Sequence, residues 1–342
     1  MTVLVRAAAL SNYAEVARQV GLDPTRMLRR VKLDPAVLTK PDTRVPVAAV
    51  VTLLENSAEQ SGCDTFGLRM AEARRLSDFG ALGLLMKHQR TLREILAMIG
   101  RYRRLLNEAL AVQVEEFGDL AIIREELVSE TNILGRQSYE LAVGTVFRMF
   151  RALLGDRWQP ESVHFTHAAP PDRSVHRRVF GLGVRFDSDF NGIVCAAADL
   201  DRINPGADAV MANYAQQLVE TLPKAELGSA ALDARKAIYL ALPVGKASLK
   251  QVAQGLGLNV RTLQRRLDAE KTSFSQLVNE VRRDLVVRYL ANNSYSMLQV
   301  AQLLGYTQLS SFTRWFAVEF GVAPTRWRSK RGGKARAYAS LT

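Results

Sequence analysis

Side chains that can read DNA bases recur at two places near the C-terminal end of the chain. Arg265 and Gln264 lie in one predicted helix, and Arg314 and Thr313 lie in a second, with Arg314 49 residues after Arg265. Arg pairs bidentately with guanine and Gln with adenine in the major groove of duplex DNA. The residue types therefore predict base contacts, provided that the surrounding elements turn both helices outward.

The stretch around these residues contains one short pattern twice. VAQGLG at 252–257 returns as VAQLLG at 300–305, an offset of 48 residues. Beyond the glycine, Leu263, Arg265 and Leu267 correspond to Phe312, Arg314 and Phe316 at an offset of 49. We therefore expect two similar units, the second with a turn that is one residue longer.

Each copy has the pattern of a helix, a tight turn and a second helix. In the first copy, Leu249, Val252, Ala253 and Leu256 are spaced along one helical face, and Gly257 is expected to end that helix in the left-handed conformation. Asn259 is expected to cap a second helix, Val260 to Glu270. In that helix Leu263 and Leu267 would point inward, leaving Arg261, Gln264, Arg265 and Asp268 on other faces. This is the arrangement of a helix-turn-helix, although an exposed arginine in a single copy is equally compatible with a solvated face.

Three serines mark helix starts. Ser248 with Gln251, Ser273 with Gln276 and Ser296 with Gln299 fit the S-x-x-Q capping box. The middle box opens an apolar run of Leu277, Val281, Leu285 and Tyr289, which predicts a linker helix from Phe274 to Leu290. A helix of that length spans roughly 25 Å. With the flanking units, it could hold two recognition helices about one DNA turn, roughly 34 Å, apart.

Taken together, this half of the chain resembles the DNA-binding domain of the AraC/XylS family of bacterial transcription regulators. The matching signature consists of Val300-Ala301, Leu304-Gly305-Tyr306, Ser311-Phe312, Arg314 to Phe316, Phe320-Gly321, Pro324 and Trp327-Arg328. Arg282 stands at an arginine that the family has in its linker helix, whereas Val286 replaces the usual alanine. The resemblance implies that Arg261, Leu309 and Ser310 occupy further DNA contact positions. It also implies promoter DNA and RNA polymerase as partners, in an activator or a repressor.

The aromatic residues of the second copy are expected to form a core. Phe312, Phe316 and Phe320 repeat every four residues along one helical stripe. We therefore predict that Trp315, Phe316, Phe320 and Trp327 are packed inside the domain and do not stack on DNA bases.

Charge separates the chain into two parts, and its length of 342 residues fits two domains. Residues 229–342 contain 18 Lys and Arg against 6 Asp and Glu, whereas residues 1–228 contain 28 of each. All of the net charge of +12 therefore belongs to the C-terminal part, as expected of a protein that binds polyanionic DNA. Binding to a membrane surface would instead require a basic amphipathic helix with a broad apolar face, and we see none in the sequence.

The N-terminal part is expected to be a mixed α/β domain. Helices are predicted around 13–20, after Asp23-Pro24, around 47–54, after Thr91 and from Arg136 to Leu154. The last predicted helix runs from Asp208 to Leu222. One side of it carries Val210, Met211, Tyr214, Leu218 and Val219. Strands 110–115 and 120–124 form a predicted hairpin, and Ser162 to His167 and Gly192 to Ala197 are two further predicted strands. Arg93, Arg101, Arg103 and Arg104 form a cationic helix face, which suits solvent better than an acidic ligand.

The order of these segments resembles the arabinose-binding-like effector domain found in one branch of the same family. The matching residues are Leu33-Asp34-Pro35, Arg44-Val45-Pro46, Phe66 to Arg69, Thr91 to Glu94 and Trp158 to Phe165. The resemblance implies a small-molecule effector, with lipids, amino acids and signals among the ligand classes, and a possible homodimer. It leaves the ligand-binding residues open.

These patterns predict four segments. We expect an effector domain at 1–222, a linker at 223–229, a double helix-turn-helix domain at 230–330 and a disordered basic tail at 331–342.

Cys63 and Cys195 are far apart in the sequence, which suits reduced thiols in the cytosol. We see no signal peptide and no transmembrane run, so a cytoplasmic protein is expected.

An enzyme is the rival class of function, and the sequence offers little for it. No P-loop, G-x-S-x-G, H-E-x-x-H or dinucleotide fingerprint is present. His164 and His167 would point to opposite faces of one strand, which prevents joint metal binding. We therefore expect no enzyme activity, cofactor or metal site. An architectural DNA-binding protein without an effector remains the alternative.

Overall fold

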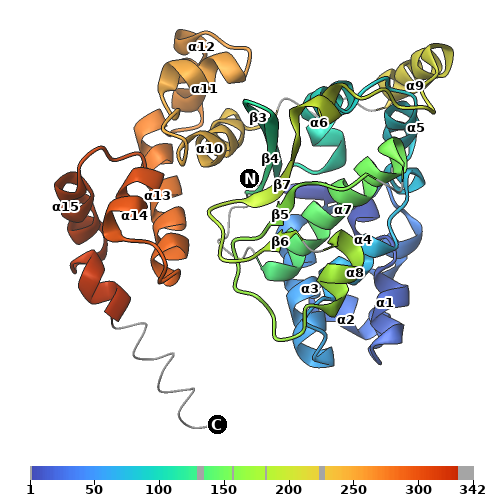
Figure 1. Cartoon of the computed structure of the whole chain (residues 1–342), viewed down its shortest axis with the longest axis horizontal. Helices are drawn as coiled ribbons and strands as arrows, with labels where there is room; N and C mark the ends of the chain where they lie inside the picture. The colour runs from blue at the N-terminus through green and yellow to red at the C-terminus, as the bar shows by residue number, and fades with distance from the viewer. Residues whose placement is uncertain (1, 129–134, 156–157, 182, 223–227, 330–342) are drawn as a thin grey trace. The chain divides into compact units, whose positions relative to one another are not determined.

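The chain folds into two compact units, 1–227 and 228–342, each described here by itself (Figure 1). The computed structural model describes residues 2–128, 135–155, 158–181, 183–222 and 228–329. Most of the expected linker and the whole expected tail at 331–342 lie outside the described residues. The α/β class predicted for the first unit and the all-helical class predicted for the second are confirmed.

A five-stranded mixed sheet forms the framework of the first unit. Its order is β3-β4-β7-β5-β6, with β5 and β6 parallel and the other neighbours antiparallel. The strands are β3 (Leu110–Phe117), β4 (Leu120–Leu127), β5 (Ser162–His164), β6 (Val184–Arg185) and β7 (Asn191–Ala196). The predicted hairpin is confirmed, with Phe117 opposite Leu120 and Gly118 in the turn at a φ of 58°. The prediction for β5 was too long, because the strand ends at His164.

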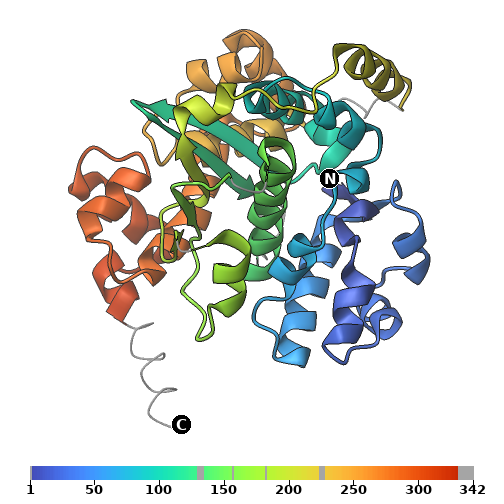
Figure 2. The same cartoon turned by 45° about the vertical axis from the view of Figure 1, so that its right-hand side comes forward.

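Helix α7 (Arg136–Leu154) is central to this unit. It packs against β4 and β7 of the sheet and against α3 (Val47–Ser61) and α4 (Phe66–Glu72) (Figure 1, Figure 2). Its predicted bounds are confirmed, and its apolar side chains are buried as expected. The approach to α4 requires glycine, because a Cβ on Gly67 would lie 2.0 Å from the carbonyl oxygen of Gln137. A Cβ on Gly144 would lie 2.7 Å from the Cβ of Ala71.

The remaining elements surround this centre. They are β1 (Leu4–Arg6) and β2 (Arg44–Pro46), which pair in a small second sheet, the α-helices α1 (Tyr13–Gln19), α2 (Pro24–Arg30), α5 (Ala81–Lys87), α6 (Leu92–Leu106), α8 (Ser174–Phe180) and α9 (Ala209–Thr221), and the 3-10 helices η1 (Ala7–Leu10), η2 (Pro35–Thr39), η3 (Leu76–Phe79) and η4 (Ala197–Asp201). The predicted caps Asp23 and Thr91 accept backbone N–H bonds at a helix start. Asp208, predicted as the first residue of the last helix, is instead the N-cap of α9. Our sequence analysis missed β1, β2, α4, α5 and β6, which are all seven residues or fewer.

The apolar side predicted for α9 is present but largely exposed. Helix α9 packs on α5, and only Ala215 and Val219 are buried. Val210 and Tyr214 are 63% and 64% exposed. The regular spacing of these side chains is therefore not matched by burial within the unit.

The second unit is all helical in its described residues, with a helical stretch at 324–329 after six labelled helices. The labelled helices are α10 (Ala230–Ala241), α11 (Leu249–Gly255), α12 (Val260–Ala269), α13 (Phe274–Ala291), α14 (Met297–Leu303) and α15 (Leu309–Phe320). The predicted repeat is confirmed, because α14 starts 48 residues after α11 and α15 starts 49 residues after α12. Gly257 and Gly305 have the predicted left-handed φ angles of 68° and 74°.

The helix caps are simpler than predicted. Ser248, Ser273 and Ser296 each accept the N–H bond expected of an N-cap. Only Gln299 also reaches back to the backbone N–H of its serine, so among these three sites the complete capping box is present only at Ser296. Gln251 instead accepts a bond from the Ser248 hydroxyl, because its side chain is turned toward that group.

Helix α10 was not predicted as an element. Ser229 caps it, and Glu270, directly after α12, accepts the Ala230 N–H at 2.6 Å. Ala234, Ile238 and Leu242 are buried at every fourth position, the same signal that predicted the linker helix. Helix α10 packs on α13, where Val286 is fully buried and the larger side chain at this position is accommodated in the core.

The aromatic core around α15 agrees in large part with the sequence. Phe312 and Phe316 are fully buried. Trp315, Phe320 and Trp327 are half-buried, and each contacts the Phe316 ring. They pack inside the domain as predicted, but each of them keeps an exposed edge.

The variant Phe316→Ala should lower the free energy of unfolding by about 3 to 5 kcal/mol, because it removes a large side chain from a filled core. Denaturant unfolding would measure the loss. Val318→Ala is the matched control, since Val318 lies on the same helix but is 80% exposed, and it should change stability by about 0.5 kcal/mol or less. Equal stability of the two variants would contradict the core assignment.

A carboxyl group is buried without a partner in the first unit. Glu125 on β4 is 1% exposed, and neither carboxyl oxygen accepts a hydrogen bond in the described structure. Burial raises the pKa of Glu125 to about 8. The folded chain therefore holds this proton at a pH where the unfolded chain, with a glutamate pKa of about 4.3, has released it.

The stability contributed by protonated Glu125 should be complete below pH of about 4.3 and should fall as pH rises to about 8. Glu125→Gln removes this dependence, so it should raise the melting temperature more at pH 8 than at pH 5. Glu59→Gln, at an exposed position, controls for the loss of one charge. A melting-temperature difference that is the same at both pH values would refute the assignment.

Candidate nucleic-acid interface

Helix α12 presents a polar face to solvent because its apolar residues are buried. Leu263 and Leu267 are at most 1% exposed. Arg261, Gln264 and Arg265 are all exposed, and their spacing of three and four residues places them along one face of the helix. The sequence analysis predicted this orientation, and the structure brings all three side chains together.

Helix α15 repeats the arrangement in the second unit. Leu309, Ser310 and Arg314 are exposed, and Thr313 is half-buried. The Thr313 hydroxyl donates to the Leu309 carbonyl at 2.9 Å, which leaves the oxygen lone pairs available as acceptors. Ser310 and Arg314 lie on the side of the helix opposite buried Phe312 and Phe316, whereas Leu309 and Thr313 flank that buried stripe.

Arginines in this unit fall into two groups by their partners. Arg282 donates from Nε to the Leu304 carbonyl at 3.0 Å, and its guanidinium lies 4.2 Å from the centre of the Tyr306 ring. Arg235 pairs with Asp284 at 2.7 Å, and Arg328 donates to the Tyr295 carbonyl at 2.7 Å. These arginines hold segments of the unit together, and Arg282 in particular joins the linker helix α13 to the end of α14.

By contrast, Arg261, Arg265 and Arg314 have no ion pair or side-chain hydrogen bond within the described residues. Their guanidinium groups are solvated and keep all five N–H donors available. An exposed arginine without a partner can approach phosphate or a guanine edge without first breaking a contact.

An open groove of about 880 Å³ runs beside α12. Arg261, Gln264 and Arg265 line it from one side, and Ser273, Phe274 and Ser275 line it at the start of α13. The sequence analysis used Ser273 only as a helix cap. Because Ser273 follows α12 by only a few residues, its position in the sequence could have shown that it borders the same surface as α12.

The linker helix α13 is 18 residues long, which corresponds to about 27 Å. Leu277, Val281, Leu285 and Tyr289 are buried along it as predicted. It packs on α10 of the first half and on α14 of the second. One continuous helix thus connects the two helix-turn-helix units.

The two histidines considered for metal binding have separate partners. His164 lies between the hydroxyls of Ser162 and Ser188, at 2.9 and 3.0 Å, and stacks on Phe190. Burial lowers the pKa of His164 to about 4, so the ring is neutral. His167 lies beyond the end of β5 and contacts other groups. The predicted separation is therefore correct, although the strand itself does not reach His167.

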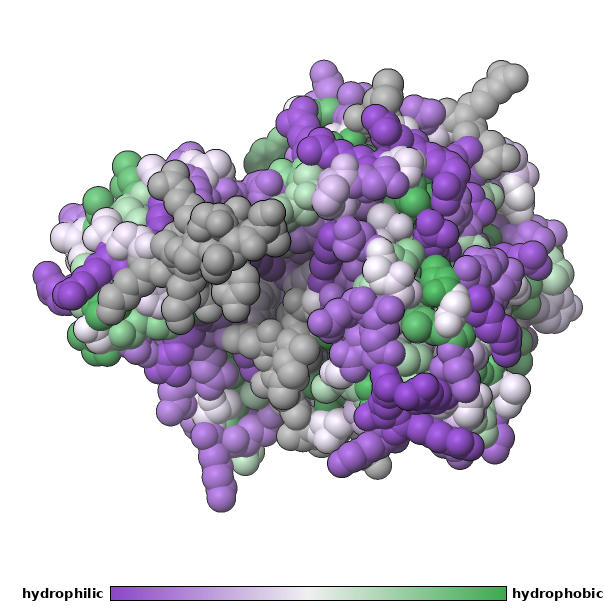
Figure 3. Space-filling view, turned by 90° about the horizontal axis from the view of Figure 1, so that it is seen from below, coloured by the Kyte–Doolittle hydropathy of each residue, from purple (hydrophilic) through white to green (hydrophobic). Residues whose placement is uncertain are grey.

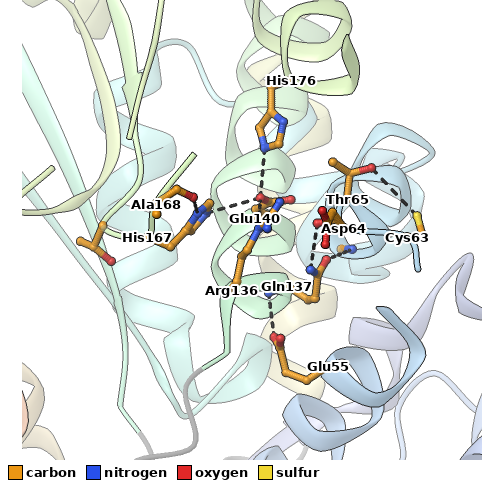
Figure 4. Close-up of polar contacts among 12 residues, drawn as sticks. Glu55, Cys63, Asp64, Thr65, Arg136, Gln137, Glu140, His167, Ala168 and His176 are labelled. Carbon is orange, nitrogen blue, oxygen red and sulfur yellow. Dashed lines mark hydrogen bonds and ion pairs between the residues drawn. The ribbon is translucent and has the colours of Figure 1, made fainter. Parts of the chain in front are cut away.

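His167 belongs to a buried cluster around Glu140 (Figure 4). The Oε1 atom of Glu140 lies 3.0 Å from Arg136 Nε, 3.0 Å from His176 Nε2 and 3.4 Å from His167 Nε2. Next to it on α7, Gln137 accepts the Gly67 N–H and donates to the Asp64 carbonyl. These contacts tie α7 to α4 and α8. Within the described part of the chain, no group of three His, Cys, Asp or Glu side chains can hold a metal ion.

The cationic face predicted on α6 is partly neutralised. Arg93 pairs with Glu116 and Asp201, at 2.6 and 2.7 Å. Because these groups are exposed, the pairs contribute little to stability, but they occupy the guanidinium. Arg93 is therefore neither a free solvated cation nor an available ligand site.

Hydrophilic residues predominate on the face drawn in Figure 3, with hydrophobic ones in small groups. None of the helices in the described residues is long and apolar enough to cross a membrane.

Comparison with known proteins agrees with this geometry. Residues 21–204 match the arabinose-binding domain of AraC transcription regulators, N-terminal part, and residues 252–330 match a helix-turn-helix domain. The chain is 31% identical over 342 residues to the HTH-type transcriptional regulator VirS of Mycobacterium tuberculosis, covering 97% of this chain and 98% of that protein. It is 24% identical over 332 residues to the ornithine utilization regulator of Pseudomonas aeruginosa, covering 95% and 96%.

The solved structure of the transcriptional regulator CdpR from Pseudomonas aeruginosa is 21% identical and covers 89% of this chain and 97% of that one, with a TM-score of 0.41. Because the N-terminal match covers more than half of the chain and VirS aligns along nearly all of it, this chain belongs to the AraC family of DNA-binding transcription regulators.

Proposed function

We propose that the chain binds promoter DNA by placing α12 and α15 in the major groove and reads bases with the residues on their outward faces. These residues are Arg261, Gln264 and Arg265 on α12, and Leu309, Ser310, Thr313 and Arg314 on α15. The observation that carries the proposal is the pair of outward faces with unpaired arginines, each opposite a buried apolar stripe.

Each of these residue types has a role in base recognition. Arg265 and Arg314 suit the O6 and N7 acceptors of guanine, and Gln264 suits the N6 and N7 groups of adenine. Leu309, which is 40% exposed, suits contact with a thymine methyl group. The continuous α13 helix supports a fixed spacing between the two sets, which would then contact successive turns on one side of the duplex.

The first unit is proposed to sense a small molecule and to alter how the second unit binds at a promoter. Support comes from the match of residues 21–204 to an effector-binding domain. A homodimer through this unit and a contact with RNA polymerase belong to the same proposal. VirS and the ornithine utilization regulator are named as regulators, which supports a regulatory function without enzyme activity. A protein that binds chromosomal promoters would act in the cytoplasm.

An architectural DNA-binding protein is the competing function. It would bind many sequences with similar affinity and would have no need of a unit of more than 200 residues for an effector. Footprinting on the chromosome would separate the two functions, because a regulator protects discrete promoter sites.

Arg265→Ala should weaken binding to a DNA site selected from random duplexes by about 1 to 3 kcal/mol and relax the preference at one base step. Arg266→Ala is the matched control, since Arg266 is exposed on the same helix but turned to another face. Arg266→Ala should lower the affinity for selected and random DNA equally, or leave both affinities unchanged. Equal weakening of both DNAs by Arg265→Ala, measured by fluorescence anisotropy, would refute the base contact.

The fragment 229–342 should bind DNA by itself, because it carries the whole net charge of +12. Its affinity should fall steeply with salt, with a slope of about −0.9 in log K against log salt for each phosphate contacted. The fragment 1–225 should not bind DNA but should retain effector binding. Gel shifts of both fragments across a salt series would test this division, and DNA binding by the N-terminal fragment alone would contradict it.

A further inference from the structure

We propose that a cavity inside the first unit binds a small monocarboxylic acid with an apolar body, and that this acid is the effector. The inference rests on the proposed effector-sensing function. It adds the location of the site and the chemical class of the ligand.

The cavity has a volume of about 150 Å³ and a mainly aliphatic wall. Val50, Val51 and Leu54 of α3 line it, together with Ile99 of α6 and Leu141 and Met149 of α7. An apolar cavity of this volume is large enough for a benzene-sized molecule. The apolar body of the ligand is therefore limited to about six to eight non-hydrogen atoms.

Two hydroxyl groups without partners interrupt this wall. Ser138 and Thr145 both line the cavity from α7, seven residues and therefore about two helical turns apart, and neither buried hydroxyl has a hydrogen-bond partner in the described structure. On α3, by comparison, Thr52 and Ser57 donate to the carbonyl four residues earlier. Leaving a buried hydroxyl unpaired is unfavourable, so a ligand that supplies a polar group here would be stabilised by satisfying it.

The cavity wall also contains a buried cation. Arg74 is 9% exposed and donates from its two terminal nitrogens to the carbonyl oxygens of Ala8 and Ala9, the latter at 2.7 Å. Its Nε has no partner, and no carboxylate among the described residues forms an ion pair with it. Burial lowers the pKa of Arg74 to about 10, so the group is still charged at neutral pH.

The other charged groups in the wall leave this cation uncompensated at contact distance. Arg6 is paired with Asp42 and also donates to the Phe79 carbonyl. Asp78 accepts the Arg75 N–H and acts on Arg74 only at longer range. A carboxylate is the small group that can accept a hydrogen bond from Arg74 Nε and neutralise its charge at the same time. An amine would be repelled.

Sugars fit this cavity poorly, although the family domain is named for arabinose. A pentose has a hydroxyl or ring oxygen at every carbon, and most of these would face aliphatic side chains without a partner. A doubly charged anion such as phosphate would lose more hydration than one arginine can replace. The wall therefore selects one negative charge on an otherwise apolar molecule.

The test uses the full chain and four probes, namely benzoate and hexanoate with their neutral matches benzamide and hexanamide. Calorimetric titration and thermal shift would measure binding. We expect both acids to bind and to raise the melting temperature with concentration, and the amides to bind at least tenfold more weakly. Equal binding of acids and amides would overturn the role of Arg74, and binding of neither acid at millimolar concentration would overturn the site.

Three variants locate the binding. Arg74→Met should abolish the preference for acids over amides. Because Arg74 also tethers η1, Thr145→Val provides a variant that should fold at least as well as the wild type and still weaken acid binding. Ala142→Leu should block acids and amides together, since Ala142 lines the cavity. Unchanged acid binding by Thr145→Val and Ala142→Leu would place the acid elsewhere and refute the proposal.

Gel shifts of the same variants on the selected DNA site separate this inference from the proposed function. If DNA binding is retained while no acid binds, only the ligand assignment fails. If another small molecule changes DNA affinity and Ala142→Leu does not affect that response, effector sensing stands and this cavity is not its site. A wild-type chain that does not bind DNA in these gel shifts would instead contradict the proposed function itself.

Discussion

The exposed polar faces of α12 and α15, which we propose contact DNA, depend on the burial of a narrow apolar stripe in each helix. In α12 the stripe is Leu263 and Leu267, and in α15 it is Phe312 and Phe316, all inaccessible to solvent or nearly so. A helix that buries one side must expose the other, because side chains three or four residues apart share a face. The outward position of Arg265 and Arg314 therefore follows from packing on the opposite side of each helix. Without the buried stripe the unit would not fold, and the exposed side chains would lose their fixed orientation.

The same residue type serves two purposes in this unit, and the difference lies in its partners. Arg282 is held between the Leu304 carbonyl and the Tyr306 ring, so it joins the linker helix to the second helix-turn-helix. Burial raises the pKa of Tyr306 to about 12, which keeps its ring neutral beside the cation. Arg265 is exposed on α12 and has no ion pair or side-chain hydrogen bond in the described structure. A paired arginine contributes to the shape of the unit, and an unpaired one is available to nucleic acid.

The first unit is arranged around α7, which carries both a polar network and an apolar cavity wall. Toward α4 and α8, Glu140 and Gln137 form buried hydrogen bonds that fix the position of the helix. Facing the cavity, the Ser138 and Thr145 hydroxyls have no hydrogen-bond partner among the described residues. Buried polar groups are normally paired, so unpaired ones along a cavity point to a ligand more directly than the cavity volume does. One helix thus provides rigidity through some of its polar side chains and a proposed binding site through others.

The sequence alone determined where most longer helices start, which faces they bury and how often they repeat. Helix caps such as Asn259, glycines such as Gly257 and the four-residue spacing of Leu277, Val281 and Leu285 act over a few neighbouring residues, so they can be read without the fold. The exposure of Arg261, Gln264 and Arg265 on α12 was predictable for the same reason. Short elements such as β6 were missed because two residues carry no periodicity, whereas seven-residue helices such as α11 were found through their caps and glycines. Three other properties follow from the tertiary structure. Tyr214 on α9 is exposed, Glu125 is buried with no partner in the described part of the chain, and Arg74, Ser138 and Thr145 line one cavity. Those properties depend on contacts between segments distant in the chain, and no local pattern encodes which distant residue will supply a partner or leave one missing.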